Sequence, residues 1–376
     1  MLRSTAIASL LLFVASGCTL IAPSKPGIGK AVQWTDLPGW DQDKHSQAWP
    51  ALLKSCQRLA ATDAPWGLIC SSATEIDNPT DSVTRQFFET HFVPHRLRGV
   101  RGKRRGLITG YYEPLLWGSL EQTDRFRYPI YRRPDDLLHI ELGELFPDLK
   151  NRRVRGRLVG NKVVPYHDRA TIEGDIGPLK GHELLWVDNA EDLFFLHIQG
   201  SGRVRLPDGR IVGVGYADQN GYAYTSIGRV LADQGELELE EVSLFTIRDW
   251  LRTNSDRSVE LLSQNQSYVF FSLREETQQG PIGSFQVPLS AERSIAVDPQ
   301  TVPLGVPIWL DTSLPGDSKT PYRHLVFAQD TGGAIKGHIR ADLFWGMGPR
   351  AELMAGTMKQ PGRLYVLLPK GETDDN

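Results

Sequence analysis

Short apolar segments interrupted by glycine and proline are the feature that most restricts the fold of this chain. Its 376 residues include 36 Gly and 24 Pro, and both residue types are typical of turns. Many short, non-alternating strands favour closed β-barrels over an open parallel sheet or a helical bundle. A chain of this length also favours two domains over one.

Hydrophobic periodicity predicts where helices and strands lie. Helices are expected over residues 46–62, about 81–92, about 225–234, 242–253 and about 255–264. Strands are expected over residues 107–112, 184–187, 193–198, 268–273, 294–297, 308–310, 325–328 and 364–368. Residues 204–214 are expected to form a hairpin, because Asp208-Gly209 suits a tight turn with positive φ.

The N-terminus resembles a bacterial lipoprotein signal peptide. A basic residue, a short apolar run and three small residues precede Cys18. This pattern predicts that residues 1–17 are removed, that Cys18 is acylated, and that residues 18–30 form a lipidated tether. Simple secretion is the alternative. After this segment no apolar run approaches the roughly 20 residues that a membrane-spanning helix needs.

The charge of the chain restricts which binding partners are expected. A formal net charge of −3 removes the main electrostatic reason to expect a nucleic-acid partner. One basic stretch, residues 96–105, is interpreted as a solvated loop, and a grip on an acidic polymer near the active groove is the weaker alternative.

The remaining cysteines, Cys56 and Cys70, form an even pair in an exported chain, which predicts a disulfide. Closing a loop of this size stabilises a fold by about 3 kcal/mol in the chain-entropy model. Two buried free thiols are the alternative. No Cys/His cluster has the spacing of metal ligands, so no metal site is predicted.

Three aspartates stand among apolar strand residues. Asp298 and Asp330 each follow an apolar strand, and Asp342 precedes Leu343-Phe344-Trp345. Desolvation by such neighbours would raise the pKa of Asp342 and keep it protonated as a general acid. The alternative for any single aspartate is a turn cap or a structural hydrogen-bond acceptor.

Other catalytic motifs are rejected. Asp330-Thr331-Gly332 resembles the aspartic-protease signature, but Asp311, the only second candidate, is 19 positions away, too near for a separate lobe. Ser201 is not in a Gly-x-Ser-x-Gly elbow, and its flanking glycines do not begin a helix as a phosphate loop would. The Gly200-Ser201-Gly202 segment is interpreted either as a close approach of backbone to a ligand or as an ordinary turn.

Taken in order, the motifs resemble those of the membrane-bound lytic murein transglycosylase A family. The resemblance extends from about Trp34 to Leu368. The motifs that carry it are Thr109-Gly110-Tyr111-Tyr112-Glu113-Pro114, Phe195-Leu196-His197-Ile198-Gln199-Gly200-Ser201-Gly202, Asn220-Gly221-Tyr222-Ala223-Tyr224, Ser294-Ile295-Ala296-Val297-Asp298 and the segment from Asp330 to Gly346.

The resemblance implies a mainly β fold with flanking helices. A double-psi β-barrel domain with N-terminal helices would comprise residues 31–115 and 254–372. An inserted β-rich domain, residues 116–253, would form the other wall of a groove for glycan strands.

The resemblance also implies an activity. The enzyme would cleave the β-1,4 bond between N-acetylmuramic acid and N-acetylglucosamine in peptidoglycan and form a 1,6-anhydromuramyl product. Asp342 would act as general acid and then as base, without a cofactor. Supporting residues would be Asp330, Asp298 and Lys336. Substrate-binding residues would be Thr109, Tyr111, Glu113, Gln199 and Ser201.

The expected location is the periplasmic face of the outer membrane of a Gram-negative bacterium, with the chain anchored through Cys18. We expect a monomer, with a cell-wall enzyme complex as a further partner. Two other functions remain open. One is a glycoside hydrolase with Asp330 or Glu113 as second carboxylate, and the other is a non-catalytic peptidoglycan-binding lipoprotein.

Overall fold

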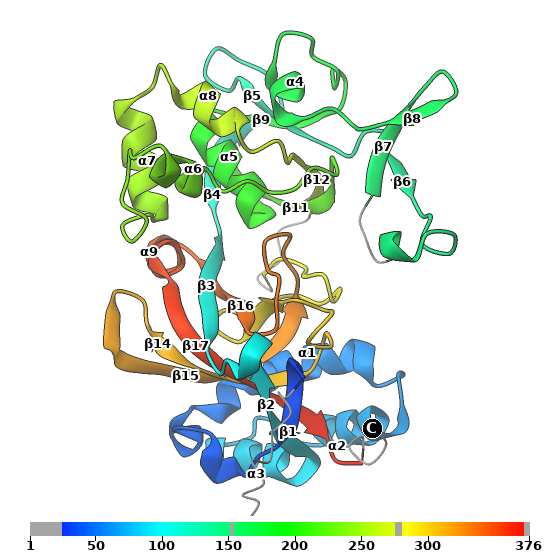
Figure 1. The fold of residues 1–376 in the computed structure, drawn as a ribbon, viewed down its shortest axis with the longest axis vertical. Coiled ribbons are helices and arrows are strands. Elements are labelled where there is room, and N and C mark those ends of the chain that lie inside the picture. Colours follow the sequence, from blue (N-terminus) through cyan, green and yellow to red (C-terminus); the bar gives the residue numbers. More distant parts are fainter. Residues whose placement is uncertain (1–24, 151–153, 275–279, 372–376) are drawn as a thin grey trace, which may run out of the picture.

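The computed structural model of the chain describes residues 25–150, 154–274 and 280–371. Cys18 and the expected signal peptide lie outside these residues. The strands form two main β units, with helices packed around them, so the fold is mainly β with flanking helices (Figure 1). No helix in the described ranges is long and apolar enough to span a membrane.

The first unit is a closed barrel. Its strands are hydrogen-bonded in the order β17 (Lys359–Pro369), β14 (Pro307–Leu314), β15 (Asp317–Asp330), β13 (Ser294–Val297), β16 (Arg340–Met347) and β3 (Gly106–Glu113). β3 pairs with β17 as well, which closes the ring. The pairs β13–β15 and β16–β3 are parallel. Outside the ring, β2 (Phe92–Arg98) pairs with β17, and β1 (Gly27–Ala31) pairs with β2.

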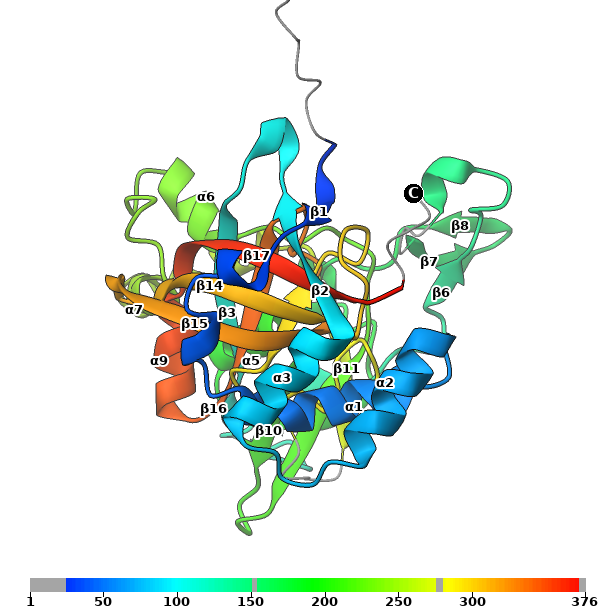
Figure 2. The ribbon, with the colours of Figure 1, turned by 90° about the horizontal axis from the view of Figure 1, so that it is seen from below.

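Three helices pack on one end of this barrel, as Figure 2 shows. They are α1 (Trp49–Leu59), α2 (Ala64–Thr74) and α3 (Asp81–His91). α1 buries Trp49, Leu52, Cys56 and Leu59 on the side that faces the core. Short 3-10 helices in the described part of the chain accompany the longer elements: η1 (Trp34–Asp36), η2 (Trp40–Gln42), η3 (His45–Ala48), η4 (Val100–Gly102) and η5 (Pro147–Leu149).

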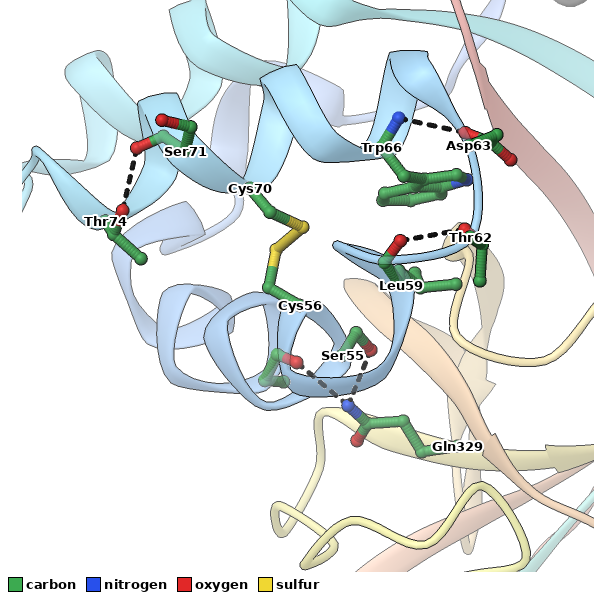
Figure 3. The surroundings of a disulfide bond; sticks show 11 residues. Ser55, Cys56, Leu59, Thr62, Asp63, Trp66, Cys70, Ser71, Thr74 and Gln329 are labelled. Atoms are coloured by element: carbon green, nitrogen blue, oxygen red, sulfur yellow. Dashed lines mark hydrogen bonds between the residues drawn. A yellow bond between two sulfur atoms is a disulfide. The ribbon is translucent and has the colours of Figure 1, made fainter.

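A disulfide between Cys56 and Cys70 joins α1 to α2, the pairing expected from the sequence (Figure 3). The helix pair also holds a barrel strand. On the neighbouring turn of α1, the Ala51 carbonyl and the Ser55 hydroxyl accept hydrogen bonds from Nε2 of Gln329, at 2.8 and 2.9 Å. Gln329 is fully buried and directly precedes the last residue of β15.

The second unit is a six-stranded sheet. Its order is β12 (Val269–Arg274), β11 (Ile211–Gln219), β10 (Ser201–Arg205), β4 (Leu115–Ser119), β9 (Glu183–Val187) and β5 (Tyr128–Tyr131). A bridge between Arg132 and Phe271 connects its two outer strands. β10 and β11 form the expected hairpin, with Gly209 at φ 87°. Because β12 belongs to this sheet, the unit continues past residue 253, where the sequence led us to expect its end.

Helices and a small sheet surround the second unit. The helices are α4 (Arg169–Glu173), α5 (Ala190–Gln199), α6 (Ile227–Asp233), α7 (Leu244–Thr253) and α8 (Ser258–Ser263). The small sheet contains β6 (Leu138–Ile140), β7 (Val154–Val159) and β8 (Lys162–Val164). One further helix, α9 (Pro349–Thr357), follows β16 and packs against β3 and β16 of the barrel.

The expected strand at residues 193–198 is wrong, because this segment lies in helix α5. Asn189 caps the helix by accepting hydrogen bonds from the backbone N–H groups of Glu191 and Asp192. Gly200 ends it in the left-handed conformation, with φ 77°. A short apolar run does not distinguish a buried strand from a buried helix, whereas the Asn cap, the acidic first turn and the final glycine indicate a helix.

Candidate active site

Strand alternation places Asp342 on the face of its strand that points away from the main barrel core. In β16, Ala341, Leu343 and Trp345 point into the main barrel core. Successive side chains point to opposite faces of a strand, so Asp342 and Phe344 lie on the other face. There Phe344 joins a small buried cluster with Tyr111, Leu289, Ala296 and Ile335.

The neighbouring strands fix the surroundings of Asp342. In register, Asp342 lies between Ala296 of β13 and Thr109 of β3. The Thr109 hydroxyl donates a hydrogen bond of 2.6 Å to Oδ1 of Asp342. Burial raises the pKa of the Asp342 carboxyl, while the Arg340 guanidinium and the Thr109 hydroxyl lower it and the charge of Asp330 raises it. The net effect is a raised pKa, which suits a carboxyl group that must carry a proton.

Asp330 ends β15 with its carboxylate surrounded by donors. Oδ1 accepts hydrogen bonds from the backbone N–H and hydroxyl of Ser284 and from the backbone N–H of Thr331, each at 2.9 Å. Oδ2 accepts one from the Tyr111 hydroxyl, also at 2.9 Å. Burial raises the pKa of Asp330, and these hydrogen bonds oppose that shift. Burial and the charge of Asp330 raise the pKa of Tyr111, so its hydroxyl stays protonated and donates.

Asp298 and Lys336 have different surroundings. Asp298 accepts hydrogen bonds from the backbone N–H groups of Gly337 and Gln300, at 2.8 and 3.2 Å. It therefore holds the turn that leads into β16. Lys336 is exposed, and within the described residues it makes no ion pair.

Of the residues expected to bind substrate, Gln199 contacts β3 directly. Its Oε1 accepts a hydrogen bond of 3.0 Å from the backbone N–H of Tyr112. Ser201 is half-buried at the start of β10. Gly202 packs tightly, since a Cβ atom there would lie 2.5 Å from Leu196. The Gly200-Ser201-Gly202 segment therefore ends a helix and begins a strand.

Glu113 is buried at the junction of the two units, with 1% of its surface exposed. It accepts hydrogen bonds from Nε of Arg203, at 3.0 Å, and from a terminal guanidinium nitrogen of Arg274, at 2.7 Å. The two arginines lie on β10 and β12. Glu113 thus connects the last residue of β3 to the second sheet.

A cavity of about 190 Å³ lies between the units. β3 and α9 line it on the barrel side, and α5, α6 and α7 line it on the other. Its lining includes Thr109, Tyr112, Phe195, Gln199, Tyr224 and Ala355. Thr109 therefore contacts both Asp342 and this cavity.

Sequence reasoning missed two residues near the aspartates. Ser284 lies in a segment without helix or strand, and only the tertiary fold brings it to Asp330. Tyr224 lines the cavity and belongs to a motif that we noted without assigning its side chain a role. No group of three or more His, Cys, Asp or Glu side chains in the described ranges could hold a metal ion.

Two protein-family models match this chain. The model of the MltA specific insert domain matches residues 107–272, and that of the 3D domain matches residues 293–368. The crystal structure of MltA from Neisseria gonorrhoeae has a TM-score of 0.78 and 34% identity, and the match covers 93% of this chain and 97% of that one. The chain belongs to the MltA family.

Two curated members of the MltA family extend the comparison. The membrane-bound lytic murein transglycosylase A of Escherichia coli K12 is 36% identical over 268 residues, which are 69% of this chain and 65% of that protein. The homolog from Buchnera aphidicola is 30% identical over 282 residues, 72% of this chain and 69% of its own length. A crystal structure of E. coli MltA with bound chitohexaose has a TM-score of 0.68 and 26% identity, covering 92% of this chain and 95% of that one.

Proposed function

We propose that this protein is a lytic transglycosylase that cleaves the β-1,4 bond between N-acetylmuramic acid and N-acetylglucosamine in peptidoglycan. The observation that carries the proposal is the environment of the Asp342 carboxyl. This group is half-buried, its pKa is raised, and it accepts a hydrogen bond from Thr109. Membership of a family whose curated members are named murein transglycosylases supports the substrate.

In the first step, protonated Asp342 donates its proton to the glycosidic oxygen. The bond from this oxygen to C1 of the muramic acid breaks, and C1 gains oxocarbenium character. A raised pKa favours this step because it keeps a larger fraction of the carboxyl groups protonated near neutral pH.

In the second step, the C6 hydroxyl of the same muramic acid attacks C1. A C1–O6 bond forms, and the hydroxyl proton passes to the Asp342 carboxylate, which restores the acid. No water is consumed. Because the nucleophile belongs to the substrate, its effective concentration is high and the protein need not supply a second carboxylate as nucleophile.

The environment of Asp330 suits an electrostatic role. Its carboxylate accepts four hydrogen bonds, from Ser284, Thr331 and Tyr111. Burial is the largest influence and leaves the pKa of Asp330 raised, but each of these donors favours the ionised form. A negative charge there raises the pKa of Asp342 and would also stabilise positive charge that develops at C1. Asp298 would act indirectly, by holding the turn before β16.

The surroundings of Glu113 favour a single catalytic carboxyl over a hydrolase pair. Its carboxylate is occupied by Arg203 and Arg274, and it is buried away from solvent. A general base must reach a water molecule beside the substrate. We therefore assign Glu113 a structural role.

Anchoring and location belong to the same proposal. Acylation at Cys18 would place the enzyme at the periplasmic face of the outer membrane, and the word membrane-bound in the names of its relatives agrees with an anchor. The two β units would correspond to the expected barrel domain and inserted domain, with the division after β12 placed at residue 274.

The test is mass spectrometry of the products from purified murein. The chain beginning at residue 19 would be compared with its Asp342→Asn variant. We expect muropeptides that are one water lighter than hydrolysis products, formed only by the unsubstituted protein, while the variant still binds murein. Products with an ordinary reducing end would replace this proposal with a hydrolase. Murein binding without any product would favour the binding lipoprotein.

A further inference from the structure

The connection between β2 and β3 is a basic loop without acidic partners. It contains η4, and residues 101–105 are all exposed. Its cations, together with Arg98 at the end of β2, make no ion pair with any acidic side chain among the described residues. Val100, in the same loop, is 59% exposed. An apolar side chain thus stands beside a group of unneutralised cations.

The first described strand adds to this charge. β1 pairs with β2, with Gly27 opposite Arg98 and Ile28 opposite Leu97. Figure 2 shows the start of β1 beside the loop. Lys25 precedes β1 and Lys30 lies within it, and both are exposed. We call the seven cations together the basic face: Lys25, Lys30, Arg98, Arg101, Lys103, Arg104 and Arg105.

The basic face differs from the rest of the molecule. The whole chain has a net charge of −3, so the remainder is distinctly acidic. We therefore expect nonspecific attraction to anions to be strongest at this face. The electrostatic attraction of these cations extends over about one Debye length, roughly 10 Å at 0.1 M salt.

The segment that joins Cys18 to Lys25 limits which surfaces the basic face can reach. Residues 27–30, expected to be part of the tether, lie instead in strand β1. Lys25 lies seven positions after Cys18, and a fully extended segment of that length spans at most about 25 Å. An acyl chain at Cys18 would therefore keep the basic face close to the membrane surface. A phospholipid leaflet with anionic headgroups is the surface within its reach.

We propose that the basic face docks on an anionic phospholipid surface, with Val100 entering the headgroup region. Lysine and arginine side chains next to an anionic leaflet are attracted to it, and exposed apolar side chains among them add to binding at the interface. This inference goes beyond the proposed activity.

Docking would also set the position of the proposed site. Thr109, which hydrogen-bonds Asp342, lies four residues beyond Arg105. At about 3.3 Å per residue, that distance is roughly 13 Å along β3. The site would be held at a fixed and short distance from the leaflet, and cleavage would be confined to glycan strands near it.

Carboxylates of murein are the competing ligand, because the loop packs beside the segment that leads to Asp342. A Cβ atom at Gly99 would lie 3.8 Å from Ile339, and one at Gly106 would meet the Ile339 carbonyl. The experiment therefore measures binding to vesicles and digestion of murein with the same variants.

The test uses the unacylated chain from residue 19, which keeps every described element. Cosedimentation would compare phosphatidylcholine vesicles with vesicles that also contain about 30% phosphatidylglycerol. The loop variant combines Arg101→Ser, Lys103→Ser, Arg104→Ser and Arg105→Ser. The matched control removes four exposed cations of the second unit through Lys180→Ser, Arg210→Ser, Arg229→Ser and Arg252→Ser.

We expect the unsubstituted chain to bind only the anionic vesicles and to dissociate in about 0.5 M salt. The loop variant should bind at least about tenfold more weakly, while the control binds as before and all three chains digest murein equally. Equal loss of vesicle binding in both variants would overturn the docking face. Unchanged vesicle binding by the loop variant would also overturn the docking face. If that variant then digested murein more slowly, the loop would be assigned to substrate binding instead. Equal melting temperatures would establish that the variants are folded.

Discussion

Thr109 and Asp342 are joined side chain to side chain, with the Thr109 hydroxyl 2.6 Å from Oδ1 of Asp342. The two residues are in register on the parallel strands β3 and β16. The backbone ladder therefore fixes their separation without help from a loop. Burial raises the pKa of Asp342 and this hydroxyl lowers it, so the strand pairing itself adjusts the proton affinity of the proposed acid.

Replacing Thr109 by Val should shift the pH dependence of activity. The loss of a donor to the carboxylate raises the pKa of Asp342 further, so the protonated acid persists to higher pH and the basic limb of the kcat profile moves upward. Because the carboxylate is also less well oriented as a base, we expect kcat to fall about tenfold or more. Rates of murein solubilisation across a pH series would measure both effects. Thr109→Ser, which keeps the hydroxyl, should behave like the unsubstituted chain, and an unmoved basic limb in Thr109→Val would refute the role.

Tyr111→Phe should impair Asp330 selectively. The substitution removes the donor to Oδ2, and a hydrogen bond to a charged group contributes about 1.5 kcal/mol or more. The pKa of Asp330 rises, so the acidic limb of the kcat profile moves upward and kcat falls roughly tenfold. Tyr112→Phe is the matched control, because the Tyr112 hydroxyl donates instead to Glu352, at 3.1 Å. Equal kinetic losses in both variants would argue against a special role for Asp330.

Glu113→Gln should destabilise the fold rather than weaken substrate binding. Glu113 is buried between Arg203 and Arg274, and removing one partner from a buried ion pair typically costs about 3 kcal/mol. Urea unfolding would show this loss. Asp208→Asn, at the exposed pair with Arg210, should leave the midpoint of unfolding unchanged. A raised KM with unchanged stability would instead restore Glu113 to the substrate-binding set.

Sequence patterns over a few neighbouring residues were enough to predict some features of the fold and of the candidate site. Asp330 ends an apolar strand and Asp342 interrupts one, and the alternation of side chains then places Asp342 opposite the core. The hairpin turn at Gly209 followed from its residue type alone. Each of these features depends on a few neighbouring residues.

Features that depend on distant contacts were not predictable in this way. Ser284 reaches Asp330 across 46 positions, and Glu113 meets its arginines across 90 and 161 positions. The apolar run of α5 was assigned to a strand because its residues suit both states, and the capping residues outside the run decided the outcome. The end of the second unit was misplaced because β12 joins its sheet only after the intervening helices.

Asp342→Asn should raise the melting temperature at neutral pH, in addition to its effect on catalysis. Burial places the pKa of Asp342 in the folded state above its ordinary value of 3.8. The ionised carboxyl is therefore less favourable in the folded state than in the unfolded one. This cost is absent below pH 3.8, grows as the pH rises toward the folded-state pKa, and is fully present above it.

The amide has no such charge, and its oxygen still accepts the Thr109 hydroxyl. Thermal unfolding at pH 7 should thus give a higher Tm for Asp342→Asn than for the unsubstituted chain, and at about pH 3.5 the difference should nearly vanish. Asp298→Asn provides the contrast. The Asp298 carboxylate accepts two backbone N–H groups, so its replacement should lower Tm at pH 7. A lower Tm for Asp342→Asn at pH 7 would mean that its ionised carboxyl stabilises the fold, which is incompatible with a raised pKa and with the role of Asp342 as an acid.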